Sequence, residues 1–149
     1  GVLPPFEAWL LLRGLRTLPT RLAQHEVDAL AVARFLDGHP AVAEVFHPAL
    51  TGDPALRDAQ LRGFTGLFSF SLVDPEWEAV RRVIDGLAHF QIGVSWGGVE
   101  SLVITPDRGT NREALRESGI PPNLIRVSIG LEGTDVLISD LAQAREPSS

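Results

Sequence analysis

Apolar residues recur at a helical spacing over two stretches near the start of the chain. The first covers residues 6–15, and the second covers residues 22–36 and ends at Gly38. Spacings of three and four residues between apolar positions predict helices with one apolar face. Thr17 followed by Pro19 suits the start of the second helix. We therefore expect two separate long helices before the rest of the domain.

The remainder of the chain alternates between short β-patterned and helical segments. Residues 66–73 alternate large apolar with small side chains, which is typical of a half-buried strand. Asp74, Pro75 and Glu76 form a strong helix start. Strands are expected at residues 42–46, 66–73, 92–95, 102–104 and 124–131, with helices within 49–62 and at 74–87, 112–117 and 135–144, and a frayed end at 145–149. The order predicts one α+β domain, a small mostly antiparallel sheet covered by helices on one face and preceded by long helices.

Composition narrows the class of protein. The chain has 149 residues, a net charge of −6, thirteen scattered basic residues and no cysteine. A negative chain without a basic patch does not suit a nucleic-acid partner, and the absence of cysteine excludes disulfides and thiolate metal sites. No apolar run is long enough for a membrane span, and no secretory signal is visible. A cytoplasmic protein without membrane or nucleic-acid partners is expected.

Two residue types are missing altogether. All thirteen basic residues are arginine, so the chain contains no lysine, and it also contains no methionine. With a helix expected to begin at once after the first five residues, we interpret the sequence as a piece of a longer protein. An arginine-biased genome is the alternative, and it explains a low lysine count more easily than none.

A hydrolase is the first enzyme class that the motifs suggest. Residues 93–97 read Gly-Val-Ser-Trp-Gly and match the G-x-S-x-G turn that carries the nucleophile of α/β-hydrolases. In that fold the histidine base follows the serine, whereas all four histidines here precede Ser95. The histidines also lack the close spacing and acidic neighbours of metal sites; they are His25, His39, His47 and His89. A glycine-rich turn between strands is therefore favoured over a hydrolase or metal site.

Two further features have a structural and a functional interpretation each. Arg126 lies on an aliphatic strand, where its charge must be paired. The partner is either an internal carboxylate, such as Glu100 or Glu132, or the carboxylate of a ligand, which the planar guanidinium suits. Ser95 and Trp96 beside two glycines form either a tight turn over a buried tryptophan or a wall for a ligand, and the residues alone favour the first.

Several blocks of sequence resemble one enzyme family in the family's own order. They are residues 8–21 (AWLLLRGLRTLPTR), 24–25 (QH), 32–36 (VARFL), 39–40 (HP), 45–50 (VFHPAL), 63–70 (GFTGLFSF), 95–102 (SWGGVESL), 119–120 (GI), 124–132 (LIRVSIGLE) and 140–141 (DL). Together they cover nearly the whole chain and resemble the cysteine- and methionine-metabolism enzymes that depend on pyridoxal 5'-phosphate (PLP), above all the cystathionine β-lyases.

The resemblance implies that residues 1–149 are the C-terminal domain of a fold-type I PLP enzyme and that residues 1–37 are its interdomain helices. The implied reaction is α,β-elimination of a small amino-acid thioether, cystathionine, to homocysteine, pyruvate and ammonia, by a homotetramer. The domain that carries the PLP lysine is absent from the sequence, and with it the Schiff-base lysine. No catalytic residue is therefore expected in this chain, which alone should be inactive.

The same resemblance assigns three substrate-binding residues. Arg126 matches the arginine that binds the substrate α-carboxylate, Ser95 matches a serine near the cofactor-bearing lysine, and Trp96 lies beside it. Trp96 is similar to the β-lyases, since the γ-enzymes usually carry leucine there. Val94 matches neither the tyrosine of β-lyases nor the glutamate of γ-enzymes, and Gly133 replaces an acid that usually follows Gly-Leu-Glu. A γ-synthase, γ-lyase or sulfhydrylase, or a non-catalytic truncated domain, are the alternatives.

Overall fold

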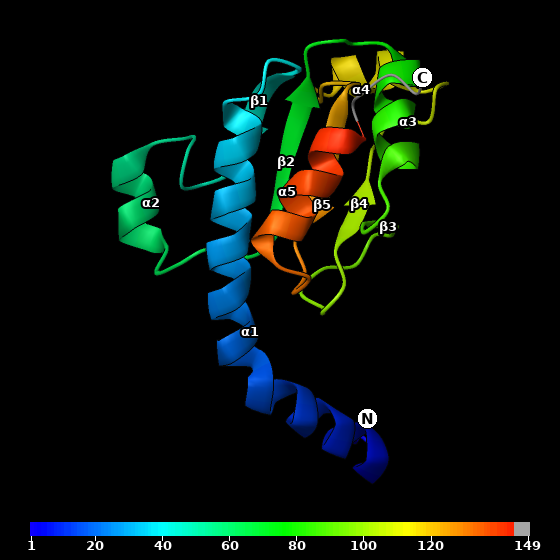
Figure 1. Ribbon diagram of the computed structural model, residues 1–149. Helices are drawn as coiled ribbons and strands as arrows, with labels where there is room; N and C mark the ends of the chain where they lie inside the picture. The colour runs from blue at the N-terminus through cyan, green and yellow to red at the C-terminus, as the bar shows by residue number, and fades with distance from the viewer. Residues whose placement is uncertain (145–149) are drawn as a thin grey trace.

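A five-stranded sheet with helices packed on one face forms the framework of the computed structural model, which describes residues 1–144 (Figure 1). The helices are α1 (Pro5–Asp37), α2 (Pro54–Gln60), α3 (Trp77–Gly86), α4 (Arg112–Glu117) and α5 (Thr134–Gln143), and the strands are β1 (Val42–Phe46), β2 (Leu67–Leu72), β3 (Gln91–Ile92), β4 (Leu102–Ile104) and β5 (Leu124–Ser128). The strand order is β1-β2-β5-β4-β3. Only the β3–β4 pair is parallel. The predicted α+β class and mostly antiparallel sheet are confirmed.

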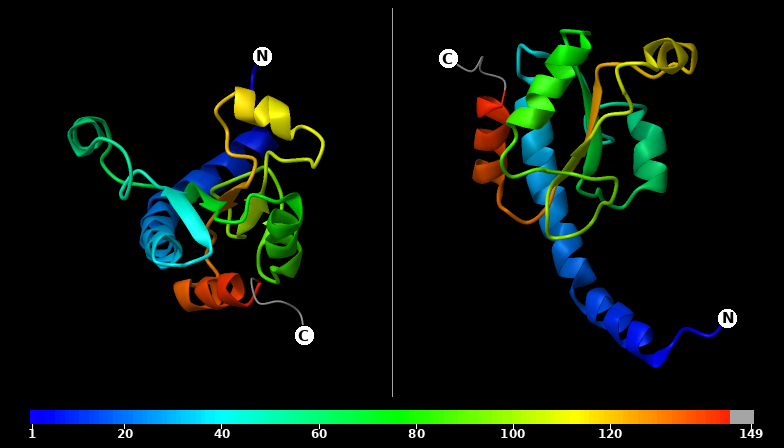
Figure 2. Two further views of the ribbon diagram at one scale, coloured as in Figure 1. Left: turned by 90° about the horizontal axis from the view of Figure 1, so that it is seen from above. Right: turned by 90° about the vertical axis from the view of Figure 1, so that its right-hand side faces the viewer.

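Three helices cover the same face of the sheet. The C-terminal half of α1 lies beside α5, and α3 lies beyond α5 along the sheet, as the view from above shows (Figure 2). Their inward side chains meet those of β2, β5 and β4 in one apolar core; its fully buried members include Val32, Leu36, Phe70, Ile125, Leu137 and Leu141. Helix α2 buries none of its residues and stands away from the sheet. The apolar core therefore lies against β5, which is the central strand of the sheet.

The two N-terminal helices predicted from the sequence are one. Helix α1 runs from Pro5 to Asp37 with Pro19 inside it, so the predicted break between Leu15 and Thr17 is wrong. A proline in a helix lacks its N–H and crowds the carbonyl four residues earlier, which bends a helix without necessarily ending it. The bend is visible in the lower part of α1 (Figure 1). Near the bend, the Arg21 guanidinium donates to the carbonyl of Gly14 at 3.1 Å.

Three other predicted elements are shorter in the structure. The helix expected from Asp74 begins at Trp77, since the Asp74 carboxylate accepts a hydrogen bond from the Glu76 N–H in a turn. The strand expected to reach residue 131 ends at Ser128, and the strand expected at residues 92–95 is only Gln91–Ile92. The prediction for residues 145–149 lies outside the described residues. Within residues 1–144, none of the helices has the length and apolar character needed to cross a bilayer.

His47, at the end of β1, makes the stability of the fold depend on pH. Its ring is fully buried between Phe64 and Phe68, and its Nδ1 accepts a hydrogen bond from the Ala49 N–H at 3.0 Å. Burial lowers the pKa of His47 below its ordinary value, and the charge of Glu26 only partly opposes this. The neutral ring is the form that the folded state prefers.

We expect the free energy of unfolding to fall as the pH drops from 7.5 to 5.5. A lowered folded-state pKa means that stability present above about pH 6.5, the ordinary histidine value, is lost as the pH falls toward the folded pKa. One such proton contributes a slope of at most about 1.4 kcal/mol per pH unit. Denaturant titrations should show a weaker slope for His47→Asn, which keeps an acceptor for Ala49, and an unchanged slope for His89→Asn at an exposed site. Equal slopes in all three proteins would contradict the expectation.

Candidate functional site

Arg126 lies at the middle of the central strand β5, opposite Ser69 of β2 and Ile104 of β4. Its side chain reaches the loop of residues 93–101, which joins β3 to β4. There Nη2 donates to the carbonyl of Val94 at 2.7 Å and more distantly to that of Ser95 at 3.5 Å. Strand order thus brings together two of the predicted site residues that are 31 positions apart in sequence.

No internal carboxylate pairs with Arg126 in the part of the chain that the structure describes. The expected alternatives, Glu100 and Glu132, form no ion pair with it. Glu132 is occupied elsewhere, because its carboxylate accepts hydrogen bonds from Ser101. Two neutral carbonyl groups orient the guanidinium but do not neutralise it. The internal salt bridge is therefore wrong for these residues, and a positive charge remains available at a half-buried position.

Ser95 and Trp96 are both exposed to solvent on this loop. After the Gly93 N–H bonds to the carbonyl of Val103, the chain leaves the sheet, which is why the predicted strand ends early. Gly97 adopts a positive φ of 76°, a conformation that suits glycine in a tight turn. The Trp96 side chain is 59% exposed, so the tryptophan does not cover the turn as a buried group. The loop thus carries an exposed serine and an exposed tryptophan at the segment whose carbonyl groups contact Arg126.

A pair of residues that the sequence analysis did not assign to the site anchors this loop. Ser101, which is fully buried, donates its N–H and its hydroxyl to the two carboxylate oxygens of Glu132, at 2.6 and 2.7 Å. The hydroxyl in turn accepts a hydrogen bond from the Gly130 N–H at 2.9 Å. The spacing of Ser101 and Glu132 in the sequence gives no sign that they are in contact. The only signal that pointed to them is that both fall within the blocks that resemble the family.

The hydrolase and metal alternatives find no support in the arrangement. Ser95 makes no hydrogen bond to a histidine among residues 1–144, and two of the histidines, His25 and His47, are buried in the packed core region. Within the same residues, no group of three or more histidine and acidic side chains could hold a metal ion. The Gly93–Gly97 match to the G-x-S-x-G motif is therefore a turn between strands.

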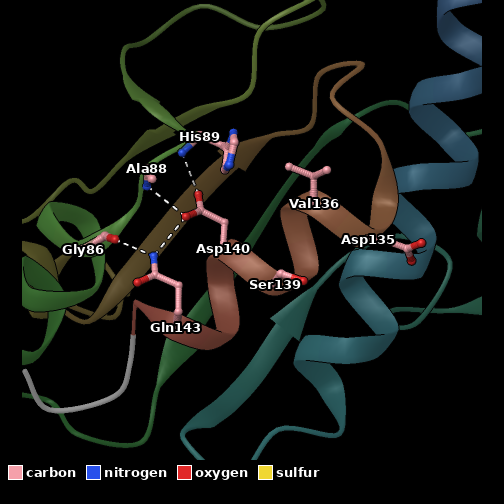
Figure 3. Close-up of a pocket in the computed structure, with 8 residues that line it drawn as sticks. All are labelled: Gly86, Ala88, His89, Asp135, Val136, Ser139, Asp140 and Gln143. Carbon is pink, nitrogen blue, oxygen red and sulfur yellow. Dashed lines mark hydrogen bonds between the residues drawn. The ribbon is translucent and has the colours of Figure 1, made fainter.

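A surface hollow of about 690 Å³ lies elsewhere, between α5 and the turn after α3 (Figure 3). The buried Asp140 carboxylate faces it but accepts the N–H groups of Ala88 at 2.9 Å and His89 at 2.8 Å. Gln143 adds a hydrogen bond to Asp140 and one to the carbonyl of Gly86. These polar groups already have partners within the fold, and none of the predicted site residues lines the hollow. We therefore interpret the hollow as a depression beside an internally hydrogen-bonded turn, and not as the functional site.

Comparison with known proteins points to one family. The profile of the "Cys/Met metabolism PLP-dependent enzyme" family matches residues 1–146. A cystathionine beta-lyase of Lactococcus lactis subsp. cremoris (strain MG1363) is 36% identical over 98% of this chain and 40% of its own length. A cystathionine gamma-lyase of Bacillus subtilis (strain 168) is 39% identical, with the same two coverages.

A solved structure supports the same assignment at the level of the fold. Cystathionine gamma synthase from Xanthomonas oryzae pv. oryzae, in complex with cystathionine, superposes with a TM-score of 0.83 at 42% identity. The match covers 95% of this chain and 38% of that one. The chain thus spans about two fifths of the length of the proteins it resembles. Its sequence blocks, its sheet and its helices all align with these enzymes, and the chain belongs to the Cys/Met metabolism PLP-dependent enzymes.

Proposed function

We propose that residues 1–149 are the C-terminal, substrate-carboxylate-binding domain of a PLP-dependent carbon–sulfur lyase that cleaves cystathionine by α,β-elimination. The observation that carries the proposal is the Arg126 guanidinium, which two carbonyl groups orient and no carboxylate of residues 1–144 neutralises. A partly exposed guanidinium that no carboxylate neutralises is available to an anionic ligand, and its planar shape suits a carboxylate. The β-lyase of L. lactis among the relatives supports the choice of reaction.

The residues of this chain fit the substrate side of such a site and not the attachment of the cofactor. PLP, when bound, supplies an electron sink for the Cα of an amino acid. Its covalent attachment needs a lysine amine, and the printed sequence contains no lysine. That amine must therefore come from residues other than these 149. What the chain itself offers is a cation, a hydroxyl and an apolar ring.

Each of the three residues has a separate task in the proposal. Arg126 binds the α-carboxylate with the nitrogen atoms of its guanidinium that Val94 and Ser95 leave free, which orients the amino acid about its Cα. Ser95 supplies an exposed hydroxyl on the same loop for a second polar contact with the amino acid. Trp96, beside it, supplies an apolar wall that excludes water from the thioether chain. Binding energy is thereby used to orient the scissile bond.

The N-terminal half of α1 supports the domain assignment. Its large apolar side chains are about half exposed and point to more than one side of the helix; they are Phe6, Trp9, Leu10, Leu11, Leu12 and Leu15. A helix that is apolar all round is normally buried on all sides. In our proposal the catalytic domain and a neighbouring subunit of a homotetramer cover it, and residues 1–37 connect the two domains.

A γ-elimination or γ-replacement enzyme is the second candidate. The B. subtilis relative is a cystathionine gamma-lyase at 39% identity, and Val94 occupies the position before Ser95 where the resemblance expects tyrosine or glutamate. The two activities cleave opposite carbon–sulfur bonds of the same thioether. Their products therefore separate them.

Incubating the full-length enzyme with cystathionine should yield homocysteine, pyruvate and ammonia in equal amounts. One water is consumed for each thioether cleaved, and mass spectrometry of the keto acid is sufficient as the measurement. Cysteine with 2-oxobutyrate instead would establish the γ-lyase and exclude our choice. A full-length protein that retains no PLP and releases no keto acid would support a non-catalytic domain.

A further inference from the structure

We propose that Glu132 is a positioning residue, which acts through Ser101 to hold the loop of residues 93–101 in the place where its carbonyl groups orient Arg126. The inference rests on the proposed function, since it takes Arg126 as the carboxylate-binding residue. Glu132 does not touch the substrate in this proposal. Its effect passes through three successive contacts, each described by the structure.

The first contact is the Glu132–Ser101 pair, in which one carboxylate accepts both donors of one buried serine. The distances of 2.6 Å from the N–H and 2.7 Å from the hydroxyl are those of charge-assisted hydrogen bonds. Glu132 makes no ion pair among residues 1–144, so its charge is committed to this serine. The Ser101 hydroxyl also accepts the Gly130 N–H, which completes its hydrogen bonding. The pair thus ties the C-terminal end of the loop to the chain that follows β5.

The second contact is the close approach of loop and strand exit. The Leu131 N–H donates to the carbonyl of Val99 at 2.8 Å. Gly130 leaves no room for a side chain there, since a Cβ atom would lie 2.5 Å from the Val99 carbonyl oxygen and 2.6 Å from a Glu132 oxygen. Between this end and Arg126 the loop is held more loosely, because the Gly97 N–H donates to the Ser128 hydroxyl only at 3.4 Å and the side chains of Val94, Trp96 and Val99 are all exposed by more than half. The position of the loop therefore depends largely on this anchored end.

The third contact is the one that matters for substrate. Val94 O lies 2.7 Å from Arg126 Nη2, so the loop sets the rotation of the guanidinium. If the loop moves outward, Arg126 keeps its charge and its place on β5 but loses the orientation that a bidentate contact requires. Weakening the Glu132–Ser101 pair should then reduce the affinity for a carboxylate more than it reduces the stability of the sheet.

The test compares Glu132→Gln with Ser101→Ala and with Glu113→Gln, a matched control on the exposed side of α4, in the full-length enzyme. A glutamine has only one acceptor oxygen, so at least one of the two bonds from Ser101 is lost. We expect KM for an α-amino-acid substrate to rise by about five- to thirtyfold in both loop variants, with kcat changed less than about twofold. Hydrogen exchange of the amides in residues 93–101 should accelerate in the same two proteins and not in the control.

Double variants decide whether Glu132 acts through Arg126. In an Arg126→Lys background, Glu132→Gln should raise KM by less than about twofold, since the orientation that it maintains is already lost. Full multiplication of the two effects would overturn the inference, as would a lowered Tm with unchanged KM and unchanged exchange in the loop. If Glu132→Gln fails to fold, Ser101→Ala makes the same three predictions.

The design also separates this inference from the proposed function. An Arg126→Lys variant with unchanged kcat/KM would overturn the carboxylate role of Arg126. Faster exchange of residues 93–101 in Glu132→Gln would even then support the part of the inference that concerns the loop. Unchanged exchange in both loop variants would overturn that part, whatever Arg126 does.

Discussion

Replacing Arg126 with lysine in the full-length enzyme should lower kcat/KM for an amino-acid substrate by about thirty- to a thousandfold. Lysine keeps the positive charge but loses the planar, two-pronged geometry, and it cannot contact both Val94 and a ligand carboxylate in the same way. Loss of a charge-assisted bidentate contact at a shielded site costs about 2–4 kcal/mol. At about 1.4 kcal/mol for each factor of ten, that cost gives the range stated.

Steady-state kinetics and thermal melting of one purified variant distinguish the carboxylate role from a structural one. We expect the loss to fall on substrates with an α-carboxylate, while Tm and the absorbance of the bound cofactor stay close to the parent. Arg116→Lys, on the exposed part of α4, is the matched control and should leave both kinetics and Tm unchanged. A destabilised Arg126→Lys enzyme with unchanged kcat/KM per folded molecule would refute the carboxylate role.

The 149-residue chain by itself should release no pyruvate from cystathionine, even with PLP added in excess. The reason is chemical and does not depend on the fold: all thirteen basic residues are arginine, and arginine does not replace a lysine amine in binding this cofactor covalently. The measurement is a coupled pyruvate assay, with detection at least about a thousandfold below the turnover of a typical enzyme.

The full-length enzyme assayed under the same conditions is the positive control for this expectation. Absorbance of protein-bound cofactor should remain with the full-length enzyme after dialysis and should be lost from the 149-residue chain. Pyruvate release by the chain, together with cofactor that survives dialysis, would contradict the expectation and would require an attachment site other than lysine.

Local patterns in the sequence are sufficient to predict most of the elements. The alternation in residues 66–73 corresponds to β2, and the apolar spacing in residues 22–36 corresponds to the buried half of α1. Alternation works because a strand presents successive side chains to opposite faces, and helical spacing works because one side of a helix is buried. The resemblance to the PLP-dependent family was likewise readable from the sequence, since whole blocks of residues carry it. The comparisons confirm both the family and its cofactor.

Local patterns failed to predict the ends of elements where contacts distant in sequence, or the persistence of helical hydrogen bonding, decide them. Pro19 reads as a helix start in isolation, yet the hydrogen bonding of α1 persists on both sides of it and the helix bends. Residues 93–95 read as strand because their side chains suit one. The carbonyl groups of Val94 and Ser95 instead turn toward Arg126, which lies on a strand distant in sequence. A side chain that is far away in sequence thus outweighs the local propensity.

The sequence by itself determined the α+β class, the family, the absence of a cofactor lysine and the candidate residues Arg126, Ser95 and Trp96. Only the tertiary structure decided what these residues contact. An internal salt bridge to Glu100 or Glu132 and a contact with a ligand carboxylate are equally compatible with the sequence. In the described residues neither glutamate forms an ion pair with Arg126, and the Glu132 oxygens instead accept two short hydrogen bonds from Ser101. Pairing across 31 residues is a property of strand order, which residue spacing does not encode.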